Sequence, residues 1–359
     1  MASETTQALW GAALPAFDEA AAAAARAHQT QLTKPPGSLG RLEDLAVFYA
    51  GARGAFPVAA PSRARVYVFA ADHGVTAEGV SPYPSSVTAA MVANFVAGGA
   101  AISVLTRALD VELAVVDVGV ASPIPGGAGR SELLSFRVRP GTANFLREPA
   151  MTRAEAEQAL DVGARLAHDA ANEGVELLGA GEMGIGNTTA AAAVVAALTG
   201  AAAESVVGRG TGVDDAGLER KIDVVRGALT RHRPDRGDAL GALAAVGGLE
   251  IAGMAGLMLG GAARRVPVVV DGFISGAAAL VATRLAPRAR DYLCFSHLSA
   301  ERGHRVVYDA LDARPLLDLG MRLGEGTGAA LAIQLLRAAV RLQSEMATFA
   351  SAGVANRAG

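Results

Sequence analysis

The residues best suited to chemistry stand in a glycine-rich stretch, residues 177–194, with the sequence LLGAGEMGIGNTTAAAAV. The pattern predicts the end of a buried strand, a glycine turn at residues 179–186 and the start of an alanine-rich helix. Asn187, Thr188 and Thr189 stand where that helix needs an N-cap. Because the first N–H groups of a helix are free and its N-terminal dipole is positive, the turn suits a bound phosphate.

Glu182 lies inside this turn, beside any ligand bound there. A carboxylate repels phosphate, so Glu182 is better suited to a ribose hydroxyl or a nitrogen heterocycle. A plain strand-to-helix turn with a capped helix explains the same residues, and local chemistry leaves both interpretations open. The spacing is neither that of a P-loop, since no Lys follows the glycines, nor that of the G-x-G-x-x-G fingerprint.

A second glycine-flanked carboxylate, Glu325, lies in RLGEGTG at residues 322–328, ahead of a long C-terminal helix. Two such carboxylates, polar loops at strand ends and candidate phosphate contacts suit group transfer on a phosphorylated metabolite by general-base catalysis.

The segment KPPGSLGRLE at residues 34–43 has two interpretations. Its prolines and glycines predict a stiff linker between helices, which the spacing alone favours; alternatively, Lys34 and Arg41 around a rigid turn reach a phosphate.

Metal chemistry and the common nucleophile motifs have little support. The six histidines are scattered: His73 directly follows Asp72, and His297 stands seven residues before His304, so structural roles are favoured over metal ligation. The single cysteine, Cys294, excludes an intramolecular disulfide and a multi-cysteine metal site. Neither a G-x-S-x-G nor an H-E-x-x-H motif occurs, and nothing points to a Ser/His/Asp triad. We therefore expect neither a bound metal nor a cofactor.

The composition is that of a large apolar chain of balanced charge. With 359 residues, 51% of them hydrophobic, the chain can bury an ample core in more than one layer or domain. A net charge of −3 gives no electrostatic case for binding nucleic acid or an anionic membrane. The N-terminus has no secretory pattern, and two uncharged windows, residues 80–106 and 183–203, are interrupted by polar residues or Gly, so we interpret them as buried helices. These features and the lone cysteine predict a cytoplasmic protein.

The elements that must position these residues alternate between strands and helices. Short apolar runs predict strands at residues 65–70, 114–118, 135–138, 175–178, 266–271 and 292–295. Longer segments predict helices at residues 14–32, 86–109, 152–173, 246–261 and 277–286. The alternation predicts a doubly wound, mostly parallel α/β sheet of about six strands at residues 61–299, whose polar strand ends hold the ligand.

Both ends of the chain predict helices only. We expect residues 1–60 and 300–359 to form a small helical domain together. In the C-terminal helix one apolar stripe needs a partner surface; it consists of Leu331, Leu335, Ala338, Leu342 and Met346.

Seven blocks carry a family resemblance. They are KPPGSLGRLE (34–43), ADHGV (71–75), GEMGIGNTT (181–189), KIDVVR (221–226), VGGLEIAGM (246–254), VVVDGFIS (268–275) and MRLGEGTGAALA (321–332). With these blocks the chain resembles the nicotinate-nucleotide–dimethylbenzimidazole phosphoribosyltransferase family, which makes the lower-ligand ribotide of cobalamin. The blocks follow the family's order from residue 34 to the C-terminal helix, so the resemblance covers nearly the whole chain.

The resemblance implies a reaction and the residues that perform it. A benzimidazole base is transferred onto nicotinate mononucleotide, which releases nicotinate and leaves an α-ribotide phosphate. Glu325 matches the catalytic base, Glu182 a second carboxylate of the same pocket, and Lys221 a phosphate contact. The positions that hold the nucleotide match Gly184, Gly186, Asn187 and Thr188. The resemblance also implies a homodimer, in which the small domain of one subunit helps to close the site of the other. We add Lys34 to the predicted phosphate contacts and leave open which of the two subunits supplies it.

The base pocket departs from the family pattern. Tyr83, Met91 and Met183 stand where other members carry Ser, Gln and Leu. The choice among a benzimidazole, a purine and a phenol therefore stays open. Two alternatives remain: a homologous phosphoribosyltransferase acting on phenols or purines, and a non-catalytic nucleotide-binding regulator, which the pair of Glu182 and Glu325 disfavours. A Rossmann dehydrogenase fits poorly because the first strand lacks a G-x-G-x-x-G turn.

Overall fold

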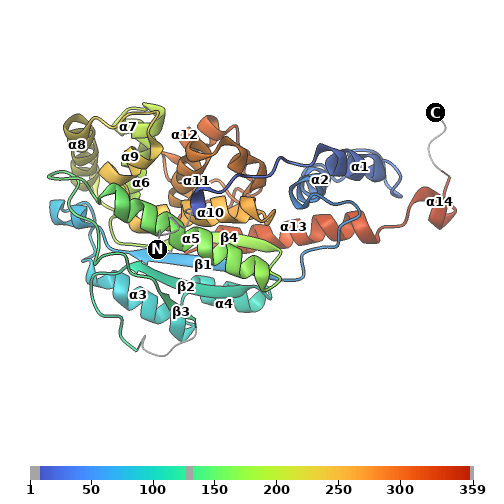
Figure 1. Ribbon diagram of the computed structural model, residues 1–359, viewed down its shortest axis with the longest axis horizontal. Coiled ribbons are helices and arrows are strands. Elements are labelled where there is room, and N and C mark those ends of the chain that lie inside the picture. Colours follow the sequence, from blue (N-terminus) through green and yellow to red (C-terminus); the bar gives the residue numbers. More distant parts are fainter. Residues whose placement is uncertain (1–8, 127–131, 356–359) are drawn as a thin grey trace, which may run out of the picture.

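The computed structural model describes residues 9–126 and 132–355, and Figure 1 shows an α/β body with a narrower helical extension at one end. Six strands form one sheet among these residues, and every neighbouring pair is parallel. They are β1 (Ala64–Ala71), β2 (Glu112–Gly119), β3 (Leu133–Ser135), β4 (Leu177–Met183), β5 (Val268–Val270) and β6 (Leu293–Phe295). Their order, β3-β2-β1-β4-β5-β6, is that of a doubly wound sheet, which confirms the predicted fold class.

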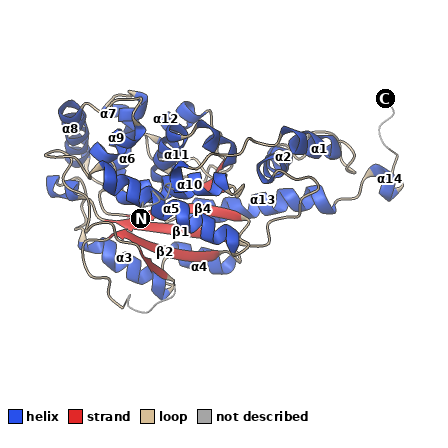
Figure 2. Ribbon diagram, in the orientation of Figure 1, coloured by secondary structure: helices blue, strands red, loops and turns tan. Residues whose placement is uncertain are grey.

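Helices connect the strands and cover the sheet, as Figure 2 shows. The α-helices are α1 (Glu19–Gln29), α2 (Arg41–Arg53), α3 (Ser86–Ala97), α4 (Ala101–Ala108), α5 (Arg153–Asn172), α6 (Asn187–Thr199), α7 (Ala203–Val206), α8 (Asp215–His232), α9 (Ala239–Val246), α10 (Leu249–Ala263), α11 (Phe273–Leu285), α12 (His304–Leu311), α13 (Thr327–Glu345) and α14 (Phe349–Ala352). Short 3₁₀ helices are η1 (Leu9–Gly11), η2 (Gly74–Glu78) and η3 (Pro287–Tyr292).

Alternate residues of β1 enter two separate cores, one on each face of the sheet. Tyr67 and Phe69 belong to the larger core, in which α5 and α10 pack against each other over the sheet. Val66 and Val68 belong to the smaller core, to which α3, α4 and α13 contribute. A pleated strand imposes this period of two, and a strand buried on both faces is apolar along its whole length. The sheet is therefore the middle layer of three.

The strand β4 runs further than the sequence predicts. Gly179, Gly181 and Glu182 lie within the strand, so the predicted turn at residues 179–186 is wrong in its first half. A Cβ added at Gly179 would stand 2.8 Å from Val66 Cγ2, and one at Gly181 would stand 2.6 Å from the carbonyl oxygen of Glu325. These two glycines therefore allow neighbouring segments to approach β4 closely rather than letting the chain turn.

Two further boundaries differ from the prediction. The helix expected at residues 86–109 is divided into α3 and α4, because Gly98 adopts a φ of 84° and ends α3. The third strand lies at Leu133–Ser135 rather than 135–138, in register with residues 115–117 of β2. By length and composition alone, residues 86–108 are the one segment of the described chain that could cross a membrane, but the break divides it into helices of 12 and 8 residues.

The extension in Figure 1 contains α1 and α2 from the N-terminal part of the chain and the end of α13 from the C-terminal part, while η1 contacts α5 and α10 of the body. α1 and α2 pack on each other and on α13, and Leu32 pairs with Thr348 in a short antiparallel bridge. α13 also contacts β4 and β5, so it joins the extension to the sheet, while α12 packs on α11 within the body. The predicted helical domain of residues 1–60 with 300–359 stays a prediction as a separate unit, and its residues 1–8 and 356–359 lie outside the described chain.

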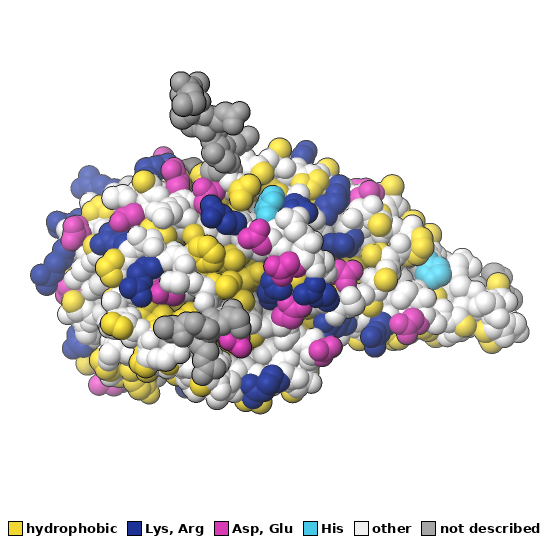
Figure 3. Space-filling view, turned by 60° about the horizontal axis from the view of Figure 1, so that its bottom comes forward, with side chains coloured by type: hydrophobic (Ala, Val, Ile, Leu, Met, Phe, Trp, Pro, Cys, Tyr) yellow, Lys and Arg dark blue, Asp and Glu magenta, His cyan; other side chains and the backbone are white. Residues whose placement is uncertain are grey.

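The face of α13 that meets the sheet differs from the predicted stripe. Ile333, Leu336 and Val340 are fully buried. Of the predicted stripe, Leu331, Leu335, Leu342 and Met346 are half-buried and Ala338 is exposed, so the partner surface expected for this stripe stays a prediction. On the face of the molecule in Figure 3, basic and acidic side chains are interspersed, and they form no extended field of one sign there.

Candidate active site

A cavity of about 630 Å³ lies beside the carboxyl ends of β4 and β5. Ligands of open α/β sheets bind at this edge, next to the point where the strand order reverses, which here lies between β1 and β4. Eight of the eleven predicted site residues line the cavity: Tyr83, Met91, Glu182, Met183, Gly184, Asn187, Thr188 and Glu325. The fold thus brings the predicted nucleotide turn, both predicted carboxylates and the predicted base pocket together.

Glu182 is the last residue but one of β4 and is only 6% exposed. Asn187, in the first turn of α6, donates a hydrogen bond from Nδ2 to Glu182 Oε2. Burial raises the pKa of Glu182 to about 8, and the nearby charges of Asp271, Glu250 and Glu325 act in the same direction, while the Asn187 bond opposes them. Glu182 therefore holds a proton near neutral pH unless a cation enters the cavity.

Glu325 lies in a left-handed turn immediately before α13. Its φ is +64°, between +81° at Gly324 and +86° at Gly326. Glu325 is 5% exposed, and its Oε2 accepts a hydrogen bond of 3.4 Å from the N–H of Ile102 in α4. Burial raises the pKa of the Glu325 carboxyl, and the Ile102 N–H opposes that rise. A buried carboxylate with a raised pKa is suited to accept a proton near neutral pH.

The Glu325 turn rests directly on β4. A Cβ at Gly324 would stand 2.1 Å from Glu182 Oε1, and one at Gly181 would stand 2.6 Å from the Glu325 carbonyl oxygen, so glycines at both positions allow the two carboxylate-bearing segments to come this close. The turn at Gly184 and Gly186 leads from the same strand into α6, and Gly186, with a φ of 92°, is the N-cap of that helix. Asn187, Thr188 and Thr189 thus form the first helical turn, and the prediction that one of them caps the helix is wrong.

Two basic side chains meet at Gly210, on the wall of the cavity. Lys221 of α8 is 1% exposed and donates from Nζ to Thr188 Oγ1 at 2.9 Å. Arg322 donates from Nη1 to the Gly210 carbonyl at 3.2 Å, and a Cβ at Gly210 would stand 3.0 Å from Lys221 Nζ. Burial lowers the pKa of Lys221 to about 8, and Glu301 opposes the shift. An anionic group at Gly210 would face two cations.

Lys34 lies in another part of the chain. Its Nζ pairs with Glu43 at 2.7 Å, and the preceding Thr33 donates its N–H to Ala347 beyond the C-terminal end of α13. Glu325 precedes the other end of this helix of 19 residues, which is about 28 Å long. Lys34 therefore does not line the cavity of its own chain, and neither does Lys221, which reaches it through Thr188.

The sequence analysis missed several residues of this wall. Asp271, His297, Ser299, Glu301 and Arg322 line the cavity but were not predicted as site residues. A usable signal existed for two of them: Asp271 ends the clearest buried strand, where sheets of this type place ligands, and Arg322 opens the RLGEG motif. The others follow β6, which is too short to identify a site by itself.

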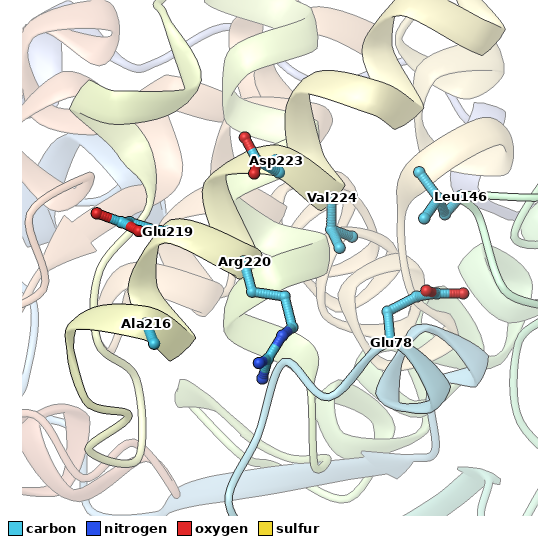
Figure 4. Close-up of a pocket in the computed structure, with 7 residues that line it drawn as sticks. All are labelled: Glu78, Leu146, Ala216, Glu219, Arg220, Asp223 and Val224. Carbon is cyan, nitrogen blue, oxygen red and sulfur yellow. The ribbon is translucent and has the colours of Figure 1, made fainter.

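A second cavity, of about 520 Å³, lies between α8 and the segments around η2 and residue 146 (Figure 4). Glu78, Glu219 and Asp223 line it, and Arg220 extends across to donate to the Gly79 carbonyl at 3.2 Å. None of the predicted site residues lines this cavity. Within residues 9–126 and 132–355, no three His, Cys, Asp or Glu side chains are grouped as a metal site would need.

The doubly wound sheet, with buried carboxylates and a pair of cations around one cavity at its carboxyl edge, defines an α/β enzyme that acts on a small molecule. Comparison with known proteins gives its family. A family model described as a phosphoribosyltransferase matches residues 14–354. The chain belongs to this phosphoribosyltransferase family and is a pentosyltransferase.

Relatives and a solved structure agree over nearly the whole length. The nicotinate-nucleotide–dimethylbenzimidazole phosphoribosyltransferase of Roseiflexus sp. strain RS-1 is 57% identical over 341 residues, which cover 95% of this chain and 96% of that protein. The enzyme of the same name from Chloroflexus aggregans is 56% identical over the same coverage. The crystal structure of CobT from Thermus thermophilus is 51% identical, has a TM-score of 0.89, and covers 94% of this chain and 100% of its own.

Proposed function

We propose that the protein transfers the phosphoribosyl group of nicotinate mononucleotide to 5,6-dimethylbenzimidazole or a related base. The products are α-ribazole 5′-phosphate and nicotinate, for assembly of the cobalamin nucleotide loop in the cytoplasm. The observation that carries the proposal is that Glu182 and Glu325 line the same cavity. The positive charges of Lys221 and Arg322 beside this cavity suit a phosphate. The names of the relatives support the choice of substrates.

The chemistry follows from the substrate. Nicotinate mononucleotide carries a pyridinium at C1′, so its leaving group is already activated. A benzimidazole nitrogen attacks C1′ from the opposite face, the bond from C1′ to the pyridinium nitrogen breaks, and its electron pair leaves with nicotinate. The configuration at C1′ inverts from β to α. Positive charge develops on the benzimidazole, and Glu325 accepts its N–H proton; a positioned general base typically contributes about 10²–10⁴-fold.

The other residues bind and orient. The phosphate lies against Thr188 and Arg322, with the charge of Lys221 directly behind Thr188, close to the N-terminus of α6, where backbone N–H groups favour an anion. Glu182, beside Asn187, faces the cationic ring, whose charge favours the ionised carboxylate. Tyr83, Met91 and Met183 supply the apolar wall for the incoming base. Enclosure between these groups holds the two reactants in line and excludes water.

The direct test is incubation of the protein with nicotinate mononucleotide and dimethylbenzimidazole, followed by mass analysis. We expect one α-ribotide phosphate for each nicotinate released. Adenine and phenol, offered separately, separate this function from that of a homologue for other bases. Binding of the nucleotide without turnover of any base would contradict the proposal and indicate a nucleotide-binding regulator.

The active assembly is a homodimer with two composite sites related by a two-fold axis. Tyr83 and Leu323 line the cavity although they are 51% and 58% exposed, which leaves room for a covering surface. The half-buried stripe of α13 offers a surface for contact with a second chain. In this arrangement Lys34 reaches the cavity of the partner subunit.

A mixing experiment tests this assembly. Lys34→Ala and Glu325→Gln chains are unfolded together, refolded and assayed. If Lys34 serves the partner's site, each mixed dimer holds one intact site, and the mixture regains about a quarter of the parental activity. Each variant refolded alone is the control. No recovery, or a fully active species of 36.2 kDa in light scattering, would contradict the composite site.

A further inference from the structure

Asp271 joins β5 to the beginning of α13. It directly follows the last residue of β5 and is 2% exposed. Both of its carboxylate oxygens accept hydrogen bonds from the backbone: Oδ2 from the N–H of Gly326 at 3.2 Å, and Oδ1 from the N–H of Ala329 at 2.9 Å. Its own N–H donates to Ser275 Oγ at 3.2 Å, which holds the residue from the other side.

These contacts replace a missing cap. The N-cap of α13 is Gly326, which has no side chain to bond the free N–H groups of the first turn. An N-cap side chain normally accepts from the second or third N–H of its helix, and Ala329 is the third residue of α13. Asp271 therefore caps α13 from a different element, and its carboxylate lies at the positive end of the helix dipole.

The turn that Asp271 holds is the one that carries Glu325. At a φ of +64°, Glu325 is in the left-handed region, which a residue with a Cβ adopts only when its surroundings impose it. Gly326, whose N–H bonds Asp271, is the next residue along the chain. The hydrogen bond thus fixes the peptide that follows the Glu325 side chain.

The close approach of Asp271 to α13 also needs Gly328. A Cβ at this position would stand 2.9 Å from Asp271 Oδ1 and 2.0 Å from His297 Nδ1. His297 Nδ1 lies 3.9 Å from Asp271 Oδ1. Burial raises the pKa of Asp271 to about 7, and the N–H groups of Ala329, Gly326 and Gly328 oppose that rise, so the helix terminus favours the ionised form.

We propose that Asp271 is a positioning residue for Glu325: by capping α13 from β5 it fixes the left-handed turn that directs the Glu325 carboxylate into the cavity. The inference rests on the proposed role of Glu325 as the base. It assigns Asp271 no contact with the reacting atoms. The proposal therefore predicts that the effect of Asp271 on the rate passes through Glu325.

A double-mutant cycle in kcat tests this dependence. Asp271→Asn keeps the shape of the side chain but can accept only through one atom, so we expect kcat to fall about 10²-fold, as for a misplacement of the base by about 1 Å. The KM for nicotinate mononucleotide should change less than threefold, because Lys221 and Arg322 are unaltered. In a Glu325→Gln background, Asp271→Asn should change the residual kcat less than threefold, because no base remains to be positioned.

Asp117→Asn is the matched control. Asp117 lies in β2, is 1% exposed, accepts a backbone hydrogen bond from Val120 at 2.8 Å and pairs with Arg137 at 2.9 Å, but it does not line the cavity. Its kcat should stay within twofold of the parent. Should Asp271→Asn fail to fold, Ala329→Pro removes the donor to Oδ1 from the first helical turn, where proline is best tolerated. It should give the same loss of kcat and the same dependence on Glu325.

The outcomes separate the two proposals. The positioning role would be overturned if the double mutant lost kcat by the product of the two single losses. It would also be overturned if Asp271→Asn kept the parental kcat. A Glu325→Gln variant with parental kcat would overturn the base instead. A crystal structure of Asp271→Asn reads the geometry independently of activity: Glu325 should leave its left-handed conformation, and an unchanged turn would contradict the inference.

Discussion

His73 and Glu250 form a fully enclosed pair, with Nε2 and Oε1 2.9 Å apart, directly behind the Gly184 turn. A Cβ at Gly184 would stand 3.2 Å from His73 Nε2, and one at Gly248 would stand 2.5 Å from His73 Cε1. Burial disfavours the charged imidazole, but the Glu250 carboxylate outweighs it and raises the pKa of His73. The pair joins the motifs ADHGV and VGGLEIAGM and supports the turn on which the nucleotide would lie.

Removing one member of this pair should destabilise the fold. Glu250→Leu leaves a buried histidine without its anion, and breaking a buried ion pair costs about 3–5 kcal/mol. Replacing both residues by leucine should cost less, because no unpaired charge remains. Urea unfolding at pH 6 measures both changes. At this pH His73 is charged in the folded state, and the stabilisation is lost as the pH rises through its raised pKa. If the unfolding free energy of Glu250→Leu lies within 1 kcal/mol of that of the parent, the pair does not stabilise the fold.

The pH profile of kcat/KM should be bell-shaped with a maximum close to pH 8. The rate rises as Glu325 and Glu182 ionise, since burial raises the pKa of both, that of Glu182 to about 8. It falls again as Lys221, whose pKa burial lowers to about 8, loses the charge that binds phosphate. Lys221→Arg stays charged throughout, so the alkaline decline should disappear. A variant that retains this decline would remove Lys221 from the phosphate site.

Glu182 should also leave a signature in the stability of the free protein. Because its pKa is raised in the folded state, Glu182 holds a proton there that the unfolded chain releases above the ordinary value of 4.5. The unfolding free energy should therefore decrease as the pH rises from about 4.5 to about 8. Glu182→Gln cannot titrate, so its stability should decrease less over this range. Urea unfolding at pH 5, 6.5 and 8 measures this free energy for the parent and for Glu182→Gln. If the unfolding free energy of both proteins changes equally with pH, Glu182 is not a buried, protonated group.

The base pocket should respond to substitutions that restore the family pattern. Tyr83→Ser, Met91→Gln and Met183→Leu together remove the ring of Tyr83 and place polar side chains at residues 83 and 91 on the apolar wall of the cavity. We expect kcat/KM for adenine relative to dimethylbenzimidazole to rise about tenfold, the size of effect that one lost or gained contact has in an apolar pocket. The KM for nicotinate mononucleotide serves as the control and should stay constant. If the ratio of the two kcat/KM values is unchanged, residues other than these three select the base.

Local pattern was sufficient for part of this structure. Alternating strands and helices predicted the sheet, and the glycine-flanked Glu182 and Glu325 were recognised although they lie far apart in the chain. What failed depends on contacts between distant segments. The sequence predicts a turn at Gly181 because nothing near it along the chain reveals that the Glu325 carbonyl lies against it. The cap from Asp271 to Ala329 and the pairing of His73 with Glu250 are set by the packing of α13 and α10 on the sheet, which no local pattern encodes.

The central claim is that Glu325 is the base, and Glu325→Gln tests it most directly. The substitution keeps the size of the side chain and its hydrogen bond from Ile102, but an amide cannot accept the benzimidazole proton. We expect an unchanged Tm, a KM for nicotinate mononucleotide within threefold of the parent, and a kcat reduced by about 10²–10⁴-fold, the usual contribution of a general base. A folded variant that retains at least half of the parental kcat would contradict the account.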